Sequence, residues 1–594
     1  MAGSFVRPSL FLAGRNSWVF YFVVALLLLV ILRILPTEMQ DNKILKLFDS
    51  KSHKSNSRPS VLRPDTINGW TRDIKPSDDD APLAHEPAGL GTIRDVREEK
   101  FYKGGTATLS PVNGSLQIDP AIYDPYPEYN SAEWRRFWKG RQHFPFPMYG
   151  SYDALGLDGF ACARPLPPVD LEKVNWRTLQ EECFERNSDR YESAQQSLSV
   201  HSLPLTSVLP RYSRQDQSLP QFKPRSAAIL RAWHDMPWTE NMKHYVRSLV
   251  MELSLHTGSE YQVFILTHVK DNNIPIYAVN GDDNAQRLKE KYMPKEFHDM
   301  TILFNDHTLE SWYPAIEEHR PQYQHLQPLQ IFSQVFSDFD YYWQLEMDSR
   351  ISGHSYHFFE KAADFARNQP RKYLWERNAY FYIPGAHGTW EEFMKMVERP
   401  RPPVAHPRDD HYEWGVGEEA DLMLFLPIFD PIYTKWTYPT TIWNLSERDP
   451  RRAAPITMGR YSKTLMDAIH SAQVGQGIGL ASEMTAPSFA LWHGLKAVQV
   501  PHPIYSDGKW TPKELNRIVN KGSPEKMNGG PDSIWNWNHE YDHILFRTSY
   551  MFNTQTAEDL YRRWLGYVVD PHQYTDGSYH QDPQGRNWFD NGDL

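Results

Sequence analysis

The sequence predicts an α/β fold with a mainly parallel sheet over residues 225–510. Three observations predict it. Short apolar runs of strand length alternate with amphipathic segments of helical spacing, turn residues separate them, and no internal repeat is present. A chain of 594 residues is also long enough to bury a large core.

Four strands and two helices are predicted in the first half of this region. Thr239 is a suitable N-cap for the first helix and Gly258 a suitable end. The strands are SAAILRAW at 226–233, EYQVFILTHV at 260–269, MTILFND at 300–306 and DYYWQLEMD at 340–348, and the helices lie within 239–258 and 326–339.

Residues 18–35 are predicted to anchor the chain in a membrane. The run WVFYFVVALLLLVIL is followed by one charge, Arg33, and then by two more apolar residues. That length is close to the ~20 apolar residues that span a bilayer, and no small-residue cleavage site follows. Because basic residues precede the run, residues 1–17 are expected in the cytosol and the rest of the chain in a lumen.

Composition predicts the other boundaries. Residues 36–100 are polar and charged, which is typical of a disordered stem. Residues 101–224 form an aromatic and proline-rich accessory region that ends in a linker. Residues 511–594 are expected to be a C-terminal extension that packs on the core.

The two cysteines and two sequons fit a lumenal location. Cys162 and Cys183 are expected to form one disulfide, and two buried free thiols are the alternative. Asn113 and Asn444 begin N-glycosylation sequons, although such tripeptides also occur by chance.

Two carboxylates end the fourth predicted strand. Glu346 and Asp348 are two positions apart, so they point to the same face if the strand persists. Ligands of open parallel sheets bind at the carboxyl ends of the strands. Two hard oxygen ligands suit Mn²⁺ or Mg²⁺, with a substrate's phosphates completing the shell. The alternative is a solvated strand end, or one paired with Arg350.

Four further side chains are candidates. Glu418 and Glu419 precede an apolar run and could bind an acceptor or act as a general base; the alternative is a helix N-terminus, where acids are favoured. His502 lies between two prolines after KAVQV and could ligate Mn²⁺, or be a hydrogen-bonded core residue. Arg231, at the first strand, could contact a nucleotide or be a surface charge.

Long segments resemble a known family. They occur in the order ILRAW, YQVFILTHVKDNNIP, YYWQLEMDSR, GHSYHFF, QPRKYLWERNAYFYIPGAHGTWEEF, WGVGEEADLMLFLPIFDP and SEMTAPSFALWHGLKAVQVPHPIY. Together they resemble a fungal family of membrane-anchored proteins described as domain of unknown function 3405. More distantly, YYWQLEMD is similar to a segment of fungal Golgi α-mannosyltransferases of the GT-A fold, which use GDP-mannose and Mn²⁺. Met347 and Asp348 depart from that segment, towards the acid-x-acid motif of GT-A enzymes in general.

The second resemblance implies a GT-A-like fold and a nucleotide-sugar site. Asp348, Glu346 and His502 would hold Mn²⁺ or Mg²⁺, and Arg231, Glu346 and Asp348 would contact the donor. The expected protein is a type II Golgi glycosyltransferase, with the endoplasmic reticulum left open as its location. It would use a nucleotide sugar and a glycan or glycoprotein acceptor. The net charge of −11 argues against nucleic acid as a partner.

Two alternatives remain open. One is a non-catalytic GT-A-like protein of the secretory pathway that binds glycans or acts as a scaffold. The other is a metal-dependent hydrolase that uses Asp409, Asp410 and His411, although these residues also read as a solvated loop.

Overall fold

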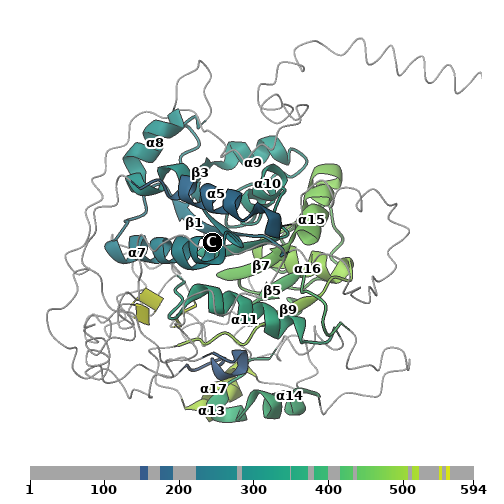
Figure 1. Ribbon diagram of the computed structural model, residues 1–594. Coiled ribbons are helices and arrows are strands. Elements are labelled where there is room, and N and C mark those ends of the chain that lie inside the picture. Colours follow the sequence, from purple (N-terminus) through teal and green to yellow (C-terminus); the bar gives the residue numbers. More distant parts are fainter. Residues whose placement is uncertain are drawn as a thin grey trace, which may run out of the picture. The chain divides into compact units, whose positions relative to one another are not determined.

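The computed structural model shows an α/β unit with helices on both faces of a central sheet (Figure 1). All described residues belong to one compact unit, Pro59–Leu594. The structure describes residues 147–157, 174–191, 223–276, 284–347, 349–371, 380–398, 415–432, 438–505, 511–520, 548–550, 557–558 and 560–561.

The described strands form a seven-stranded sheet in the order β3-β2-β1-β4-β7-β5-β9. All of them run in one direction except β7, which is antiparallel to both of its neighbours. The prediction of a mainly parallel sheet is therefore confirmed. The strands are β1 (Ser226–Trp233), β2 (Tyr261–His268), β3 (Thr301–Phe304), β4 (Tyr341–Glu346), β5 (Leu422–Leu424), β7 (Met458–Ser462) and β9 (Ala497–Gln499), and two short strands, β6 (Ile442–Trp443) and β8 (Gly479–Leu480), pair separately.

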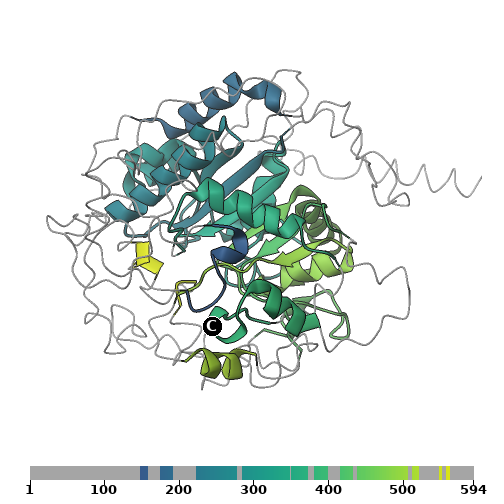
Figure 2. The same cartoon turned by 60° about the horizontal axis from the view of Figure 1, so that its bottom comes forward.

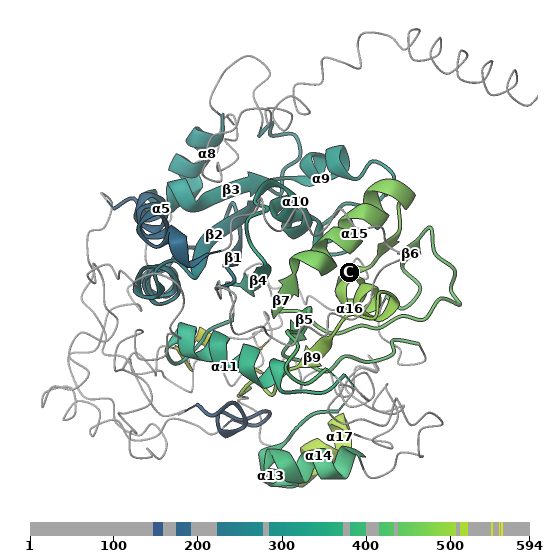
Figure 3. The same cartoon turned by 45° about the vertical axis from the view of Figure 1, so that its right-hand side comes forward.

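The helices divide between the two faces of this sheet, as Figure 3 shows. One face carries α10 (Gln327–Val335), α15 (Lys463–Gln476) and α16 (Thr485–Trp492), with α9 (Asp306–Trp312) next to α10. The other carries α5 (Trp176–Arg186), α7 (Glu240–Leu249) and α11 (Ser355–Arg367), and α8 (Asn284–Tyr292) lies near β3.

The predicted first helix has the caps that its sequence suggests. Thr239 accepts a hydrogen bond from the Met242 amide at 3.2 Å, which satisfies one of the free N–H groups of the first turn. A wider helical turn, Val250–Ser254, and a tight turn, Leu255–Thr257, follow α7. Gly258 ends the segment with φ +67°, a conformation that glycine adopts at little cost.

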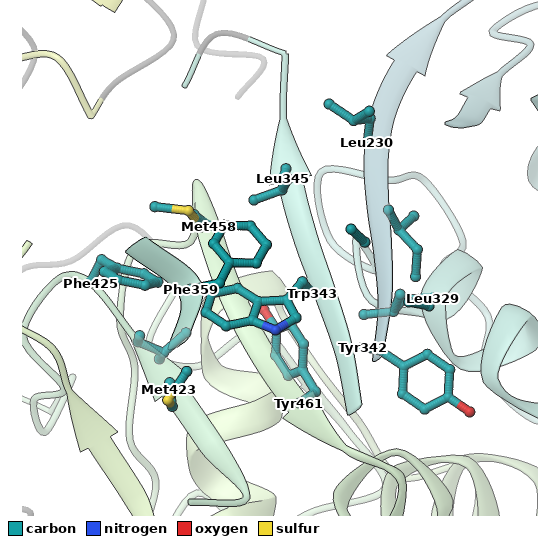
Figure 4. Close-up of a cluster of buried hydrophobic side chains, with 14 of the residues drawn as sticks. Leu230, Leu329, Tyr342, Trp343, Leu345, Phe359, Met423, Phe425, Met458 and Tyr461 are labelled. Atoms are coloured by element: carbon teal, nitrogen blue, oxygen red, sulfur yellow. The ribbon is translucent and has the colours of Figure 1, made fainter. Parts of the chain in front are cut away.

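The core explains why most residues of β4 are apolar. Its side chains alternate between the faces. Trp343 is fully buried and stacks on Phe359 of α11 with ring centroids 4.0 Å apart, while Tyr342 packs against Phe332 of α10 on the other face (Figure 4). A strand covered on both faces has no solvent side, so apolar residues are expected on both faces of β4, and Gln344 and Glu346 are its polar exceptions.

A small helical cluster lies beyond β9. It contains α13 (Pro384–His387), α14 (Trp390–Glu398) and α17 (Pro512–Val519), and Figure 2 turns it toward the viewer. Tyr382, Phe393 and Val397 belong to its own apolar core. The ring of Phe381 lies 5.1 Å from that of Tyr149, which joins this cluster to the main core.

The predicted cytosolic tail, anchor and stem (1–17, 18–35 and 36–100) lie outside the described residues. Within the ranges that the structure does describe, no helix combines the length and apolar composition needed to cross a bilayer. Parts of the predicted C-terminal extension are described: Tyr550 and Tyr561 are buried in the main core.

Candidate functional site

The sheet has a topological switch point between β1 and β4. From β1 the chain continues outward to β2 and β3, and then returns to place β4 on the opposite side of β1. At such a point the connections leave the carboxyl ends of two neighbouring strands in opposite directions, which opens a crevice where ligands bind. In this sheet, Arg231 of β1 and Glu346 of β4 lie side by side at that edge.

Arg231 and Glu346 form an ion pair across the switch point. Arg231 Nη1 is 3.1 Å from Glu346 Oε1, and Gln344 Nε2 donates to the same oxygen at 3.1 Å. Burial raises the pKa of Glu346, and the charge of Arg231 and the hydrogen bonds from Gln344 and Arg231 oppose this shift. About a quarter of the Glu346 side chain (27%) stays exposed, so a ligand can reach this pair.

Unused hydrogen-bonding groups surround the pair. Gln344 Oε1 and both ring nitrogens of His325 are buried and have no hydrogen-bond partner among the described residues. Burial and the charge of Arg231 hold the pKa of His325 well below its ordinary value, so its ring is neutral. Each unsatisfied buried polar group costs about 1–3 kcal/mol.

Gln344 and His325 were not predicted as site residues from the sequence. Gln344 could have been found, because it lies two positions before Glu346 and therefore on the same face of β4. His325 comes from the loop before α10, and only the tertiary structure brings it near Arg231.

The segment after β4 is a tight turn. Asp348 lies outside the described residues, so its predicted metal role stays a prediction. Ser349 donates to the Glu346 carbonyl at 2.8 Å. Arg350 does not pair with Glu346; its guanidinium lies 3.1 Å from Glu558 and donates to the carbonyls of Met347 and Ser349. The ion-pair partner of Glu346 is Arg231 instead.

A small cavity, partly open to solvent, lies beside this turn. It is lined by residues 350–354 and by His502, which follows β9. His502 therefore lies close to residues 350–354, which follow β4, and its role as a metal ligand stays a prediction. Aromatic rings of Phe358, Phe425 and Tyr550 surround the imidazole at centroid distances of 5.3, 5.4 and 5.7 Å.

His502 is held neutral. Burial lowers its pKa to about 3, because a charged imidazole is disfavoured among apolar rings. Its Nδ1 has no partner in the described part of the chain. A neutral imidazole is the form that ligates metals or exchanges hydrogen bonds with a substrate.

Glu418 and Glu419 lie at the other edge of the sheet. They precede β5, which runs in the same direction as β4, so its amino end is far from the carboxyl end of β4. Glu418 pairs with Arg371 at 2.6 Å, and Glu419 pairs with Arg367 at 2.6 Å and Arg460 at 2.9 Å. The expectation that one of them points into the same site as Glu346 is therefore not met.

The remaining predicted positions lie away from this edge. Cys183 is buried on α5, with its sulfur 3.9 and 3.8 Å from the carbonyls of Ser254 and Leu255. Cys162 lies outside the described residues, so the disulfide stays a prediction. Asn444 is exposed and donates to the Gly477 carbonyl at 3.0 Å. Asn113, the other sequon, and the alternative loop at 409–411 also lie outside the described ranges.

The described residues alone do not form a metal centre. Within them, no group of three or more His, Cys, Asp and Glu side chains is arranged to hold an ion. The guanidinium of Arg231 already occupies one oxygen of Glu346. A metal at this edge would therefore depend on Asp348.

The fold defines a class of protein: an α/β protein whose central sheet has a topological switch point between β1 and β4. The family model described as "Protein of unknown function (DUF3405)" matches residues 161–400 and 398–592, which is more than half of the chain. The chain belongs to this family, as its sequence motifs predict. A search among curated proteins found no match.

Proposed function

We propose that this protein is a glycosyltransferase with a GT-A-like core that transfers a sugar from a nucleotide sugar to a glycan or glycoprotein. The observation that carries the proposal is the Arg231–Glu346 pair at the switch point. Asp348 follows two residues later, as the acid-x-acid motif requires. The single antiparallel strand in an otherwise parallel sheet agrees with a mixed sheet of this kind.

Arg231 is the group we assign to the donor's diphosphate. Its guanidinium points to the edge where the donor would bind, and charge-assisted hydrogen bonds to phosphate are among the strongest in proteins. Glu346 and Gln344 fix the position of that guanidinium rather than act on the sugar. The unpartnered atoms of His325 and Gln344 offer further hydrogen bonds to the nucleotide.

A divalent cation, Mn²⁺ or Mg²⁺, belongs to the proposal through Asp348. When bound, it would neutralise charge on the leaving diphosphate. His502 would approach the same region from β9, in the neutral form that suits a ligand. We assign no general base to Glu418 or Glu419, because both lie at the opposite edge. The predicted anchor at residues 18–35 would place the domain in the Golgi lumen.

Thermal unfolding of the purified chain tests this proposal. GDP and UDP are each added with and without Mn²⁺. A nucleotide at ~100 times its dissociation constant should stabilise the fold by about 2.7 kcal/mol. We expect a shift that needs both nucleotide and metal, and that is lost in Asp348→Ala. An Asp348→Ala protein that keeps the full shift would show that the metal assignment is wrong.

The second candidate is a non-catalytic glycan-binding protein with the same fold. The observation that favours it is the engagement of Glu346 by Arg231, which leaves one carboxylate fewer for chemistry. This protein would bind glycans without metal or nucleotide. An absence of any shift with either nucleotide, together with binding to immobilised glycans, would favour this candidate.

A further inference from the structure

The carboxyl edge of the sheet carries a further acid, Glu483, in the turn Ser482–Met484 between β8 and α16. β7 ends at the amino edge, where the Lys463 amide donates to the Asp340 carbonyl at 2.8 Å. From there α15 returns along the sheet to β8 (Figure 3). The turn that follows β8 is therefore back at the carboxyl edge, the edge of the proposed donor site.

One short loop connects this turn to the donor site. In the loop before α10, the Gln322 carbonyl accepts from Ser482 Oγ at 2.6 Å, and the Tyr323 carbonyl accepts from the Ser482 amide at 2.7 Å. His325 comes two residues after Tyr323, and burial and the charge of Arg231 lower its pKa. Two residues span at most about 7 Å, so the turn lies beside the loop that reaches Arg231.

The backbone of the turn is strained. Ser482 has φ +20°, on the positive side that favours glycine and is unfavourable for a residue with a side chain. The loop before α10 holds Ser482 in this conformation, and the Ala454 amide bonds to the Glu483 carbonyl at 3.2 Å. Such strain is concentrated at functional sites, where it fixes the direction of a side chain. Here the side chain that follows the strained residue is Glu483.

The carboxyl group of Glu483 has partners only from its own turn among the described residues. Hydrogen bonds reach it from its own amide and from Ser482, and no ion pair in the described part of the chain includes it. Arg452, on the segment that pairs with this turn, lies 3.9 Å from Asp430 instead. The carboxyl oxygens of Glu483 can therefore accept a proton or a hydrogen bond from a ligand.

Partly exposed aromatic side chains lie next to Glu483. Burial, and then the charges of Glu483 and Tyr323, raise the pKa of Tyr438, so these three side chains lie close together. The ring of Tyr323 is 5.6 Å from that of Tyr438 and 6.4 Å from that of Trp443. Burial raises the pKa of Glu483 to about 7, although the residue stays partly exposed. A general base works best when its pKa is near the operating pH.

We propose that Glu483 is the general base of the transfer reaction, and that its carboxylate takes the proton of the acceptor hydroxyl. The inference rests on the proposed transferase function, and it supplies the base that Glu418 and Glu419 do not. As the proton moves to Glu483, the acceptor oxygen forms a bond to the anomeric carbon of the donor sugar. The bond from that carbon to the diphosphate breaks, and its electron pair leaves with the nucleoside diphosphate.

Hydrolysis of nucleotide sugars tests the proposal, because water can take the place of the acceptor hydroxyl. GDP-mannose, UDP-glucose, UDP-galactose and UDP-N-acetylglucosamine are each incubated with the purified full chain and Mn²⁺, and the released nucleotide is measured. We expect the parent to hydrolyse at least one donor. Glu483→Gln keeps the shape of the side chain but cannot take the proton, so its rate should fall at least about 100-fold. Its nucleotide-dependent shift in melting temperature should equal that of the parent.

Glu447→Gln is the matched control. Glu447 lies after β6 and is exposed, so its removal should change the rate by less than about twofold. The pH profile separates a base from a residue with a structural role. The rate of the parent should rise between about pH 6 and about pH 8, as Glu483 loses its proton, and Glu483→Gln should lack this rise.

Three results would overturn the role of Glu483. They are a loss of less than about 100-fold in folded Glu483→Gln, an equal loss in Glu447→Gln, or the same rise with pH in the parent and Glu483→Gln. Nucleotide binding without hydrolysis of any donor also overturns this role, but it leaves the nucleotide site in place. A parent that neither binds nucleotide nor hydrolyses a donor overturns the transferase function as well.

Discussion

The two edges of the central sheet use their charged side chains differently. At the amino edge, Glu419 pairs with Arg367 and Arg460, and Lys496 donates to the carbonyls of Arg367, Gly415 and Glu418 at 3.1, 2.8 and 2.8 Å. At the carboxyl edge, the ion pair of Arg231 and Glu346 lies next to Gln344 and near His325, whose side chains have buried polar atoms without partners among the described residues. The acids of the first edge are engaged by side chains of that edge, whereas Gln344 and His325 at the second edge keep polar atoms without partners among the described residues.

This difference shows how to separate structural acids from functional ones. In the sequence, GEEAD and LEMD look alike, since each places acids next to an apolar strand. Only the ion-pair and hydrogen-bond partners in the folded chain distinguish the two segments. Acids whose oxygens are all occupied hold the fold together, while an edge with buried groups left unpaired is a candidate for binding.

The largest expected effect is at Lys496, in the satisfied edge. Lys496 is fully buried, and Lys496→Met would take its donor from three carbonyls, although those of Arg367 and Gly415 also accept from a backbone N–H. We expect the free energy of unfolding, measured with urea, to fall by about 3 kcal/mol or more. Lys463→Met is the control, because its ion pair with Asp467 is partly exposed and should contribute no more than about 0.5 kcal/mol. Equal losses in both variants would contradict the distinction between the edges.

Two arginines should separate binding from stability. Arg231→Met should weaken nucleotide binding about 10- to 100-fold, since hydrogen bonds to charged groups contribute about 1.5–3 kcal/mol, and change the free energy of unfolding by less than about 1 kcal/mol. Arg460→Met should lower the free energy of unfolding and leave nucleotide affinity unchanged. Arg460 is buried over the ring of Tyr341 at 4.1 Å and donates to Glu419 and to the Ala420 carbonyl. Isothermal titration with GDP or UDP, beside urea unfolding, measures both. Equal nucleotide affinity in the two variants would remove Arg231 from the donor site.

Stability should also depend on pH through the carboxyl group of Glu483, a residue in the turn Ser482–Met484 whose backbone carbonyl accepts a hydrogen bond from the Ala454 amide. Burial raises its pKa from 4.5 to about 7. Between these values the folded chain keeps a proton that the unfolded chain has lost, so this contribution to stability is full below about pH 4.5 and is lost as the pH rises to about 7.

Urea unfolding of the parent and Glu483→Gln at about pH 5 and about pH 8 isolates this effect. We expect the difference in unfolding free energy between the two proteins to change by about 1–2 kcal/mol in favour of the parent at the lower pH. A difference that does not vary with pH would mean that Glu483 titrates normally.

The smallest expected effect is at Glu418. Its side chain is 42% exposed and pairs with Arg371 on the surface, so Glu418→Gln should cost less than about 1 kcal/mol and leave sugar transfer unchanged. Transfer is measured with the donor nucleotide that the thermal shifts identify. If the rate of sugar transfer fell 100-fold or more in a folded Glu418→Gln protein, Glu418 would have the catalytic role that the sequence suggests.

Several parts of the fold could be predicted from local patterns. The run SAAILRAW became β1 with the same bounds, and Thr239 and Gly258 bound the first helix and its closing turns as predicted. These features depend on apolar periodicity, capping and glycine conformation, all of which act within a few residues. The edge that carries Glu346 could be predicted as well, because a parallel sheet places its working residues at the carboxyl ends of strands.

The location of Glu418 and Glu419 could not be predicted, because it depends on the direction in which β5 runs. That direction is set by the antiparallel β7 between β4 and β5, and β7 follows both in the sequence. A cavity at the end of β9 could not be predicted either, because Tyr149, Phe425 and His502 line it together but are far apart in the chain.

The sequence by itself determined the α/β class, the four strands β1 to β4, and the family to which the chain belongs. Local periodicity and long motifs carry this information. The tertiary structure decided which charges are satisfied, because hydrogen-bond partners come from segments that pack together over long distances in the chain. It also decided that Arg231, and not Arg350, is the partner of Glu346, since strand register aligns β1 with β4.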